Sequence, residues 1–144
     1  MSPVTLRHAE TEAEIGACFP AMAELRPHLA DPAELVARVQ RQRGRGYRLL
    51  AAWRDGAVLG VAGYRMQENL IHGRFVYVDD LVVRDGARRG RLGAALLDAV
   101  AAEARAAGCA RMTLDTGLDN ALGQRFYFRW GLLATGMHFG RDLT

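Results

Sequence analysis

The sequence predicts a single domain, residues 1–144, of the α/β (α+β) class, with a mixed, mostly antiparallel sheet flanked by helices. Three observations predict it. The chain is 50% hydrophobic and 24% charged, which is typical of one globular domain of this length. Residues 47–83 have the pattern of three successive strands joined by short turns, which favours an antiparallel meander. Residues 79–116 then have the pattern of strand, helix and strand, which favours a β-α-β crossover.

One strand and a broken helix are expected before the meander. Residues 4–9 alternate apolar and polar side chains, as a strand does. Residues 11–29 carry an apolar helical stripe, and Thr11 with Glu14 has the spacing of a capping box. Two prolines lie inside this segment, so we expect a short or kinked helix.

Start and stop signals bound the next elements. Residues 31–44 are predicted to form a helix that begins after Asp31 and ends at Gly44, with a proline at its first position. Residues 47–66 contain two apolar runs on either side of an Asp-Gly pair, which is the strongest short signal for a β-hairpin.

The second half of the chain should complete the sheet. Residues 73–83 form the third strand of the meander, and residues 91–108 form an amphipathic helix that ends at a glycine. Residues 110–116 alternate as a strand, residues 119–131 form a short helix, and residues 132–143 can be a final strand. That last strand could pair across a homodimer.

Composition excludes several classes of function. No apolar run approaches the roughly 20 residues that cross a membrane, and the N-terminus lacks a secretory pattern, so we expect a cytoplasmic protein. The net charge of +3 and the absence of a recognition motif give little support for nucleic-acid binding. Cys18 and Cys109 are too few for a disulfide framework, and no residue cluster has metal-ligand spacing.

The turn after Val83 is rich in arginine and glycine and leads into a helix. A helix N-terminus offers unpaired N–H groups and the positive end of the helix dipole, which attract phosphate. Arginine adds bidentate contacts. The turn is neither a P-loop nor a dinucleotide fingerprint, so spacing alone leaves an anion site only slightly favoured over a solvated turn.

Residues 76–132 resemble the acetyl-CoA core of the GNAT N-acetyltransferases, especially small bacterial members. The family's Arg/Gln-x-x-Gly-x-Gly/Ala loop is matched by Arg88 at its first position and by Gly93 at its last. The family's later Asn-x-x-Ala-x-x-x-Tyr-x-x-x-Gly segment is matched by Asn120, Tyr127 and Gly131, with Gly123 in the place of alanine. Together these motifs are far more specific than either one.

The resemblance implies a site for acetyl-CoA. The pyrophosphate would lie on the backbone amides of Arg88, Arg89, Gly90, Arg91, Leu92, Gly93 and Ala94. The pantetheine would run beside Leu81, Val82 and Val83, and Asn120 would complete the cofactor site. One position departs from the family: Arg91 stands where the central glycine belongs, and glycine comes one place earlier. An arginine fits there if its backbone is ordinary helix and its Cβ points away.

The resemblance also implies the chemistry. The acceptor amine must attack as a neutral nucleophile, so a base must take its proton. Asp79 is our base candidate, acting through a water, because strand alternation places it on the same face as Leu81; Asp80 should then point the other way. The alternative is that both acids are solvated at a β-bulge. Tyr127 matches the general acid, against the alternative of a packed core tyrosine.

The acceptor pocket is predicted from Arg26, His28, Asp80 and His138, although a lone histidine such as His8 is more often simply packed. The predicted function is direct transfer of acetyl from acetyl-CoA to a primary amine of a small molecule or peptide. The alternative is a non-catalytic acyl-CoA-binding or regulatory module of the same fold. No metal, nucleic-acid or membrane partner is expected.

Overall fold

The structure, a computed structural model, describes residues 2–144 except the side chain of Arg89, so the predicted contact of that side chain lies outside the described part. The chain forms two compact units, Met1–Thr113 and Leu114–Thr144. The predicted phosphate turn and acidic strand belong to the first unit, while the predicted Tyr127 motif belongs to the second.

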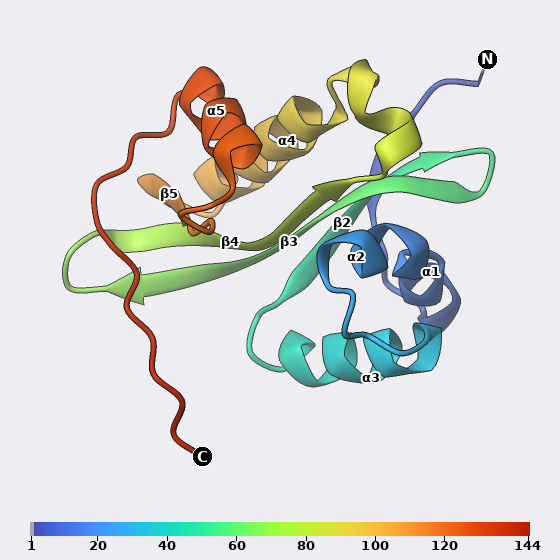
Figure 1. Cartoon of the computed structure of the whole chain (residues 1–144), viewed down its shortest axis with the longest axis horizontal. Coiled ribbons are helices and arrows are strands. Elements are labelled where there is room, and N and C mark those ends of the chain that lie inside the picture. Colours follow the sequence, from blue (N-terminus) through green and yellow to red (C-terminus); the bar gives the residue numbers. More distant parts are fainter. Residues whose placement is uncertain (1) are drawn as a thin grey trace. The chain divides into compact units, whose positions relative to one another are not determined.

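A five-stranded sheet organises the first unit (Figure 1). In spatial order its strands are β1 (Thr5–His8), β2 (Arg48–Arg54), β3 (Ala57–Asn69), β4 (Gly73–Val83) and β5 (Arg111–Leu114). The pairs β1–β2, β2–β3 and β3–β4 are all antiparallel, which confirms the predicted meander. Strand β5 follows the helix crossover and lies beside β4.

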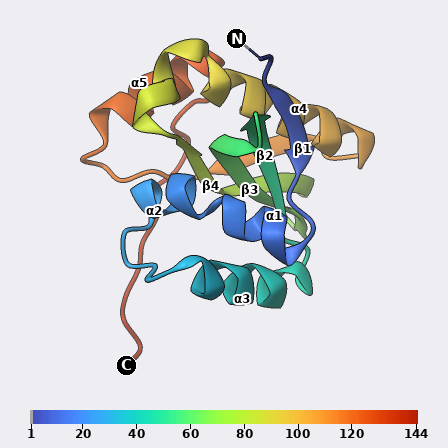
Figure 2. The same ribbon diagram turned by 90° about the vertical axis from the view of Figure 1, so that its right-hand side faces the viewer.

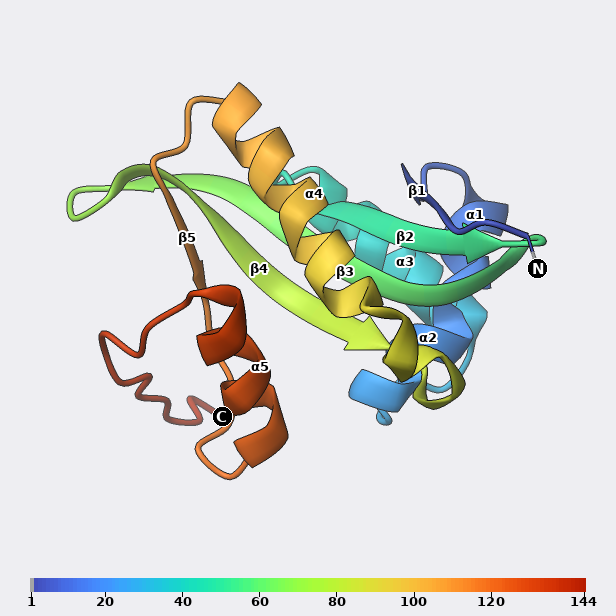
Figure 3. The ribbon, with the colours of Figure 1, turned by 90° about the horizontal axis from the view of Figure 1, so that it is seen from above.

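Helices cover both faces of this sheet (Figures 1 and 2). The helices α1 (Glu12–Ala17), α2 (Phe19–Leu25) and α3 (Pro32–Arg43) pack on one face. Helix α4 (Leu92–Ala106) lies across β3 and β4 on the other face (Figure 3). Alternate residues of β2 serve the two layers, since Leu49 and Ala51 join the α1–α3 core. The mixed, helix-flanked fold is therefore as predicted.

The local start signals act as expected. The Thr11 side chain accepts from the Glu14 N–H, and Glu14 accepts from the Thr11 N–H, which completes the capping box. The helix breaks at Cys18, just before the first proline, so the predicted segment becomes the separate helices α1 and α2. Asp31 accepts from the Glu34 N–H at 2.9 Å and caps α3.

The β2–β3 turn has the geometry that its Asp-Gly pair predicts. Asp55 has φ of 51° and Gly56 has φ of 79°, so both central residues are left-handed, as a two-residue hairpin requires.

The next pair of strands, β3 and β4, contains an irregularity. The register between them shifts between Gly63 and Tyr64. Asp80 pairs with Gly63 and Val78 with Tyr64, which leaves Asp79 as the extra residue of a β-bulge.

The prediction of a final strand at residues 132–143 is wrong. After α5 (Ala121–Trp130), residues 132–144 form neither helix nor strand. Their large apolar side chains, among them Met137 and Phe139, are mostly exposed. Alternating side chains favour a strand only where a neighbouring strand supplies the hydrogen bonds, and the homodimer contact expected through this strand therefore loses its basis.

No described helix is long and apolar enough to span a bilayer.

Candidate active site

The turn between β4 and α4 is a short 3₁₀ helix, η1 (Asp85–Gly90), which periodicity did not predict. Arg91 follows it as the N-cap of α4, with φ of 57° and ψ of 27°. The condition of ordinary helical backbone, under which an arginine fits at this position, is not met, because the chain turns at Arg91 through the left-handed region that favours glycine. Arg91 adopts this left-handed conformation at a cost of about 1 to 2 kcal/mol.

The start of α4 is open to an anion. Within the described residues, the Arg91 side chain makes no capping hydrogen bond to the first turn of the helix. The N–H groups of that turn, which begins Leu92, Gly93, Ala94, have no intrahelical acceptor. Helix α4 is also the longest in the first unit, so its N-terminus carries the full helix dipole. These features fit a pyrophosphate.

Arg88 anchors the turn to the rest of the unit. Its Nε donates to the Val83 carbonyl at 3.1 Å and its Nη1 to Asp85 at 3.2 Å. Its Nη2 lies 3.5 Å from a carboxylate oxygen of Glu24 in α2, and the same oxygen accepts from the Asp85 N–H at 3.0 Å. The arginine thus positions the turn, and Glu24 is a partner that the sequence did not indicate.

The end of β4 is placed for an extended ligand. Val82 is buried in the α1–α3 core, whereas Leu81 and Val83 are partly exposed. Strand β5 has four residues, and the residue before it, Ala110, donates to the Arg74 carbonyl at 3.0 Å near the start of β4. In the part of the chain that the structure describes, β5 lies beside the first part of β4, so the last residues of β4 form an open strand edge. An extended chain can add to such an edge.

A group of charged residues surrounds the bulge, and we call it the bulge cluster: Arg26, Tyr47, Arg65, Asp79 and Asp80. Arg65 donates to Asp79 through Nε at 2.9 Å and Nη2 at 2.6 Å, a bidentate pair. Asp80 accepts from Arg26 Nε at 3.0 Å on Oδ1 and from the Tyr47 hydroxyl at 2.8 Å on Oδ2. Arg26 also donates to the Asp79 carbonyl at 3.0 Å. The cluster ties α2 to the bulge.

Both carboxylates of the bulge cluster affect the same neighbours. Burial, and then the charges of Asp80 and Asp79, raise the pKa of Tyr47. The hydrogen bond with Asp79, and then the charges of both acids, raise the pKa of Arg65. The expectation that Asp80 points away from Asp79 is therefore wrong, because the bulge interrupts strict alternation. The alternative of two acids solvated at a β-bulge is confirmed for the bulge and is wrong for the solvation, since only 17% and 16% of their side chains are exposed.

Three residues of this region were missing from the sequence interpretation: Tyr47, Gly63 and Arg65. A Cβ on Gly63 would lie 1.8 Å from the Tyr47 hydroxyl oxygen, so the phenol occupies the space that glycine leaves. A glycine inside a buried strand often marks a bulge or a close approach, and this was the available signal. Nothing local linked Tyr47 to the acids, because 33 residues separate it from Asp80.

In the second unit, Asn120 begins α5. Its Oδ1 accepts from the Gly123 N–H at 3.1 Å and its Nδ2 donates to Thr116 at 2.9 Å. A Cβ on Gly123 would lie 2.3 Å from Asn120 Nδ2, so an alanine there would require the Asn120 amide to shift. Tyr127 is half-buried and packs edge-to-face on Phe126, with ring centroids 5.4 Å apart.

The predicted acceptor residues do not form one group. Arg26 and Asp80 are in contact within the bulge cluster. His28 is exposed, and its charge, after backbone and side-chain hydrogen bonds, helps to lower the pKa of Glu34 in α3. His138 belongs to the second unit, where it lies 3.3 Å from an aspartate. The bulge cluster therefore holds only two of the four.

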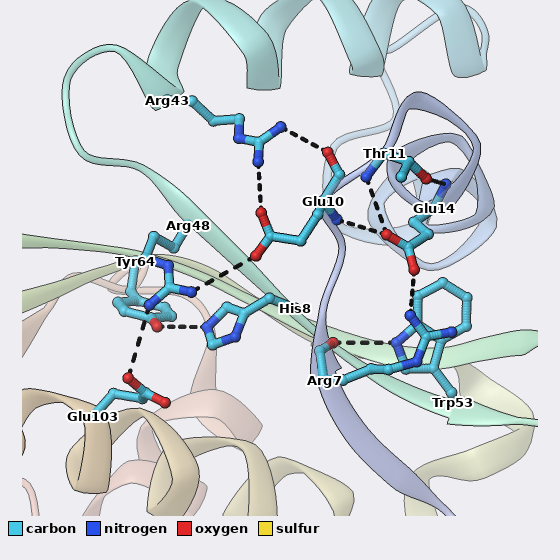
Figure 4. Close-up of polar contacts among 10 residues, drawn as sticks. All are labelled: Arg7, His8, Glu10, Thr11, Glu14, Arg43, Arg48, Trp53, Tyr64 and Glu103. Atoms are coloured by element: carbon cyan, nitrogen blue, oxygen red, sulfur yellow. Dashed lines mark hydrogen bonds and ion pairs between the residues drawn. The ribbon is translucent and has the colours of Figure 1, made fainter.

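A second polar group joins β1 to its surroundings, and we call it the N-terminal network (Figure 4). Its members are Arg7, His8, Glu10, Thr11, Glu14, Arg43, Arg48, Trp53, Tyr64 and Glu103. A cavity of about 40 Å³ lies against His8, Glu10, Arg43 and Tyr47. That volume suits water rather than a metabolite. No group of three or more metal-binding side chains occurs among the described residues.

Comparison with known proteins identifies the family. Residues 10–132 match the model of the acetyltransferase (GNAT) family. An aminoalkylphosphonate N-acetyltransferase of Salmonella typhimurium is 34% identical over 98 residues, which are 67% of this chain and 62% of that protein's length.

Solved structures share the fold. An aminoglycoside N-acetyltransferase, AAC(6')-Iy, solved in complex with CoA, superposes with a TM-score of 0.85 at 20% identity, covering 100% of this chain and 97% of the other. A transcriptional regulator from Bacillus halodurans C-125 gives a TM-score of 0.86 at 18% identity, covering 98% of this chain and 100% of the other.

Proposed function

This chain belongs to the GNAT acetyltransferase family, and we propose that it transfers acetyl from acetyl-CoA to a primary amine of a small molecule or peptide. The observation that carries the proposal is the position of the bulge cluster, whose acids immediately precede the β4 edge at Leu81–Val83. A carboxylate of β4 is thus held directly beside the part of the same strand that would receive the donor. We also propose a cytoplasmic location.

The first unit supplies a fitting donor site. The α4 N-terminus lacks a capping side chain from Arg91, and a left-handed turn precedes it, which suits close approach by a pyrophosphate. In this proposal the amides of residues 88–94 hold the pyrophosphate, and Leu81–Val83 hold the pantetheine through backbone groups. Asn120 is retained as a proposed cofactor contact. Bound acetyl-CoA supplies the activated thioester carbonyl.

The protein's residues would then manage protons. An aspartate of β4 takes the proton of the attacking amine, and Asp79 is the candidate that strand position suggested. Tyr127 donates a proton to the leaving thiolate. A phenol of pKa about 10 can serve a thiol of pKa about 8.5 when negative charge develops beside it. The acetyl group passes directly from donor to acceptor, without an acyl-enzyme.

The relatives suggest which acceptors to test. One is named for aminoalkylphosphonates and another for aminoglycosides, and both classes are amines. We propose that Arg26 and Asp80 line the acceptor site, together with His28 and His138 as weaker candidates. The bulge cluster carries both signs of charge, so the test panel should include amines with and without an anionic group.

A second candidate function is a non-catalytic acyl-CoA-binding or regulatory module. Arg91 favours it, because a bulky side chain replaces the family's central loop glycine. If Arg91 hinders the donor, then Arg91→Gly should tighten acetyl-CoA binding, and Gly86→Ala is a control in the same turn where an added Cβ meets no neighbour within 4 Å.

Release of CoA thiol across a panel of primary amines tests the proposal. We expect thiol release that depends on an amine, and Tyr127→Phe should reduce turnover far more than acetyl-CoA binding. Acetyl-CoA binding without thiol release for every amine would favour the module. Unchanged turnover in Tyr127→Phe would remove that residue from the mechanism.

A further inference from the structure

The two acids of the bulge have partners of different chemistry. Asp79 is bound on both oxygens by N–H groups of Arg65. Asp80 is bound by Arg26 on Oδ1 and by the Tyr47 hydroxyl on Oδ2. The side chains are almost equally exposed, so solvent access does not distinguish them. What distinguishes them is the response of each partner to an added proton.

Protonation of Asp79 would disrupt its pair with Arg65. A guanidinium has five N–H donors and no acceptor, so it cannot receive a hydrogen bond from a protonated carboxyl. A proton on either oxygen would face an N–H of Arg65 and would break one of two charge-assisted bonds. Protonation of Asp79 would therefore cost the bulge one of the two bonds that hold it to Arg65.

A proton on Asp80 has a ready partner. A tyrosine hydroxyl is both donor and acceptor, so the Tyr47 hydroxyl can donate to the carboxylate and then accept from the protonated oxygen Oδ2. The bond from Arg26 to Oδ1 remains throughout. Asp80 can therefore gain and lose a proton without losing a hydrogen-bond partner.

The backbone fixes Tyr47 in this position. Only 3% of the residue is exposed, and its phenol lies against Gly63 in the space that a Cβ would fill. Gly63 is also the residue paired with Asp80 across the sheet. The same bulge thus brings the phenol and the carboxylate to one place, with 16% of the Asp80 side chain left exposed for an incoming amine.

The charged groups around Asp80 come from each element packed against it. They are Arg26 at the end of α2, Tyr47 before β2, Arg65 in β3 and Asp79 in β4. Burial and the two acids raise the pKa of Tyr47, so it stays protonated near neutral pH. Asp80 therefore faces two guanidinium groups, one protonated phenol and one further carboxylate.

We infer that Asp80, rather than Asp79, takes the proton of the attacking amine, and that Tyr47 is the residue that positions it; this inference rests on the proposed acetyl transfer. The amine lone pair forms a C–N bond to the thioester carbonyl carbon, and the C–S bond breaks with its electrons going to sulfur. The amine proton moves to Asp80 Oδ2. The Tyr47 hydroxyl then turns to accept a hydrogen bond from the protonated Oδ2. The thiolate takes a proton from Tyr127, and exchange with solvent restores both residues.

Kinetics of matched variants provide the first test. Asp80→Asn should lower kcat at least about 100-fold with little change in acetyl-CoA binding, whereas Asp79→Asn should lower it less than about tenfold. Tyr47→Phe should lower kcat about tenfold with a small change in KM, which is the loss of one oriented hydrogen bond. A merely structural role would not produce this split.

The pH dependence of kcat/KM sharpens the test. The wild-type value should fall at acidic pH as the base becomes protonated. This fall should persist in Asp79→Asn, move along the pH axis in Tyr47→Phe, and vanish from the residual activity of Asp80→Asn. A fall that vanishes in Asp79→Asn and persists in Asp80→Asn would overturn the inference and leave the proposed function standing.

Stability provides a test that needs no substrate. Asparagine has the shape of a protonated aspartate, so each Asn variant imitates the protonated acid. Asp80→Asn keeps partners for both side-chain atoms, whereas Asp79→Asn sets its NH₂ against an N–H of Arg65. The denaturation midpoint should therefore fall more in Asp79→Asn. An equal fall, or the reverse order, would overturn the inference. Failure of every amine in the wild type would instead defeat the proposed function.

Discussion

The bulge cluster and the N-terminal network are built from the same residue types, and they differ in how far water is removed from them. Each combines a buried tyrosine hydroxyl with pairs of arginine and carboxylate. In the N-terminal network the arginine and glutamate side chains of these pairs are 28–54% exposed. In the bulge cluster the two acids are only 16–17% exposed, although their arginine partners, at 41% and 32%, are about as exposed as the arginines of the network. Exposed pairs contribute little to stability, whereas losing one partner of a half-buried pair leaves a costly charge.

The positions of the two groups differ as well. The N-terminal network connects separate elements: Arg43 of α3 donates to Glu10, and Arg48 of β2 lies between Glu10 and Glu103 of α4. The bulge cluster concentrates its charges on two successive residues of one strand. The first arrangement fastens layers together, and the second holds a carboxylate at a chosen place. The same chemistry thus serves assembly in one region and is suited to catalysis in the other.

The two tyrosines make this comparison testable. Tyr64 shares a hydrogen bond of 2.7 Å with His8 Nε2, and the imidazole tautomer decides which of the two donates. Burial raises the pKa of Tyr64 to about 12. Tyr47 donates instead to a carboxylate, Asp80. Both phenols stay protonated at neutral pH, so any difference in function must come from the partner.

Gly63→Ala should have the largest effect of the variants that change packing. The new Cβ would lie 1.8 Å from the Tyr47 oxygen and 2.5 Å from its Cζ, and Tyr47 is only 3% exposed, so the whole ring would have to shift. We expect a loss of about 2 to 3 kcal/mol in the free energy of unfolding, measured by urea denaturation. Activity should fall with it, because the phenol is displaced from Asp80.

A glycine outside the cluster provides the control for this variant. Gly44 has φ of −63°, and a Cβ there would meet a backbone oxygen at 3.6 Å, an ordinary contact. Gly44→Ala should change the free energy of unfolding by less than about 0.5 kcal/mol. If Gly63→Ala were equally mild, the close packing of Tyr47 on the bulge would be wrong.

Tyr64→Phe should have an intermediate effect and should separate the two regions. It removes the hydroxyl that meets His8 and leaves a half-buried imidazole nitrogen without that partner. We expect a loss of about 1 kcal/mol in the free energy of unfolding, with kcat unchanged. Tyr47→Phe, the same substitution in the bulge cluster, should lower kcat. Equal losses of kcat in the two variants would contradict the assignment of separate roles.

Much of the fold could be predicted because its signals are local. Thr11 and Asp31 cap the helices that they precede, and the Asp55-Gly56 pair adopts the predicted turn. The bulge was predicted only as an alternative, because it depends on the register between β3 and β4 rather than on residues near Asp79. The final strand failed for a related reason, since a strand needs a partner that its own sequence does not specify.

The candidate site was predicted only where the residues are neighbours in sequence or match a family motif. Asp79, Asp80 and the turn at Arg88–Ala94 were all identified in this way. Tyr47 and Arg65 were not, because they reach the acids through tertiary packing. The left-handed backbone of Arg91 was missed because glycine is the residue that such geometry favours, and an arginine gives no local signal for it.

The pH dependence of stability should reveal His8. Burial, and then the charge of Arg48, lower the pKa of His8 below its ordinary 6.5. Between the two pKa values the unfolded chain binds more protons than the folded one. The contribution of His8 to the free energy of unfolding is therefore fully present above about pH 6.5 and is lost as the pH decreases below it. The free energy of unfolding should fall from pH 7 to pH 5 less steeply in His8→Gln than in the wild type. Equal slopes would show that His8 is no more buried than in the unfolded chain.

Glu14 should give the smallest effect, because it lies on the exposed side of the N-terminal network. The N–H groups of Thr11 and Glu10, and then Arg7, lower its pKa from 4.5 to about 2. The stabilisation is therefore complete above about pH 4.5 and is lost as pH falls toward 2. Glu14→Gln keeps an acceptor for the Thr11 N–H but removes the charge, so its acid unfolding should be less steep. Glu12→Gln, in the same helical turn, provides the control.

Because the pair with Arg7 is exposed, added salt should shrink the difference between Glu14→Gln and the wild type. A difference that resisted salt would place Glu14 with the desolvated acids of the bulge cluster instead, and the contrast between the two regions would fail.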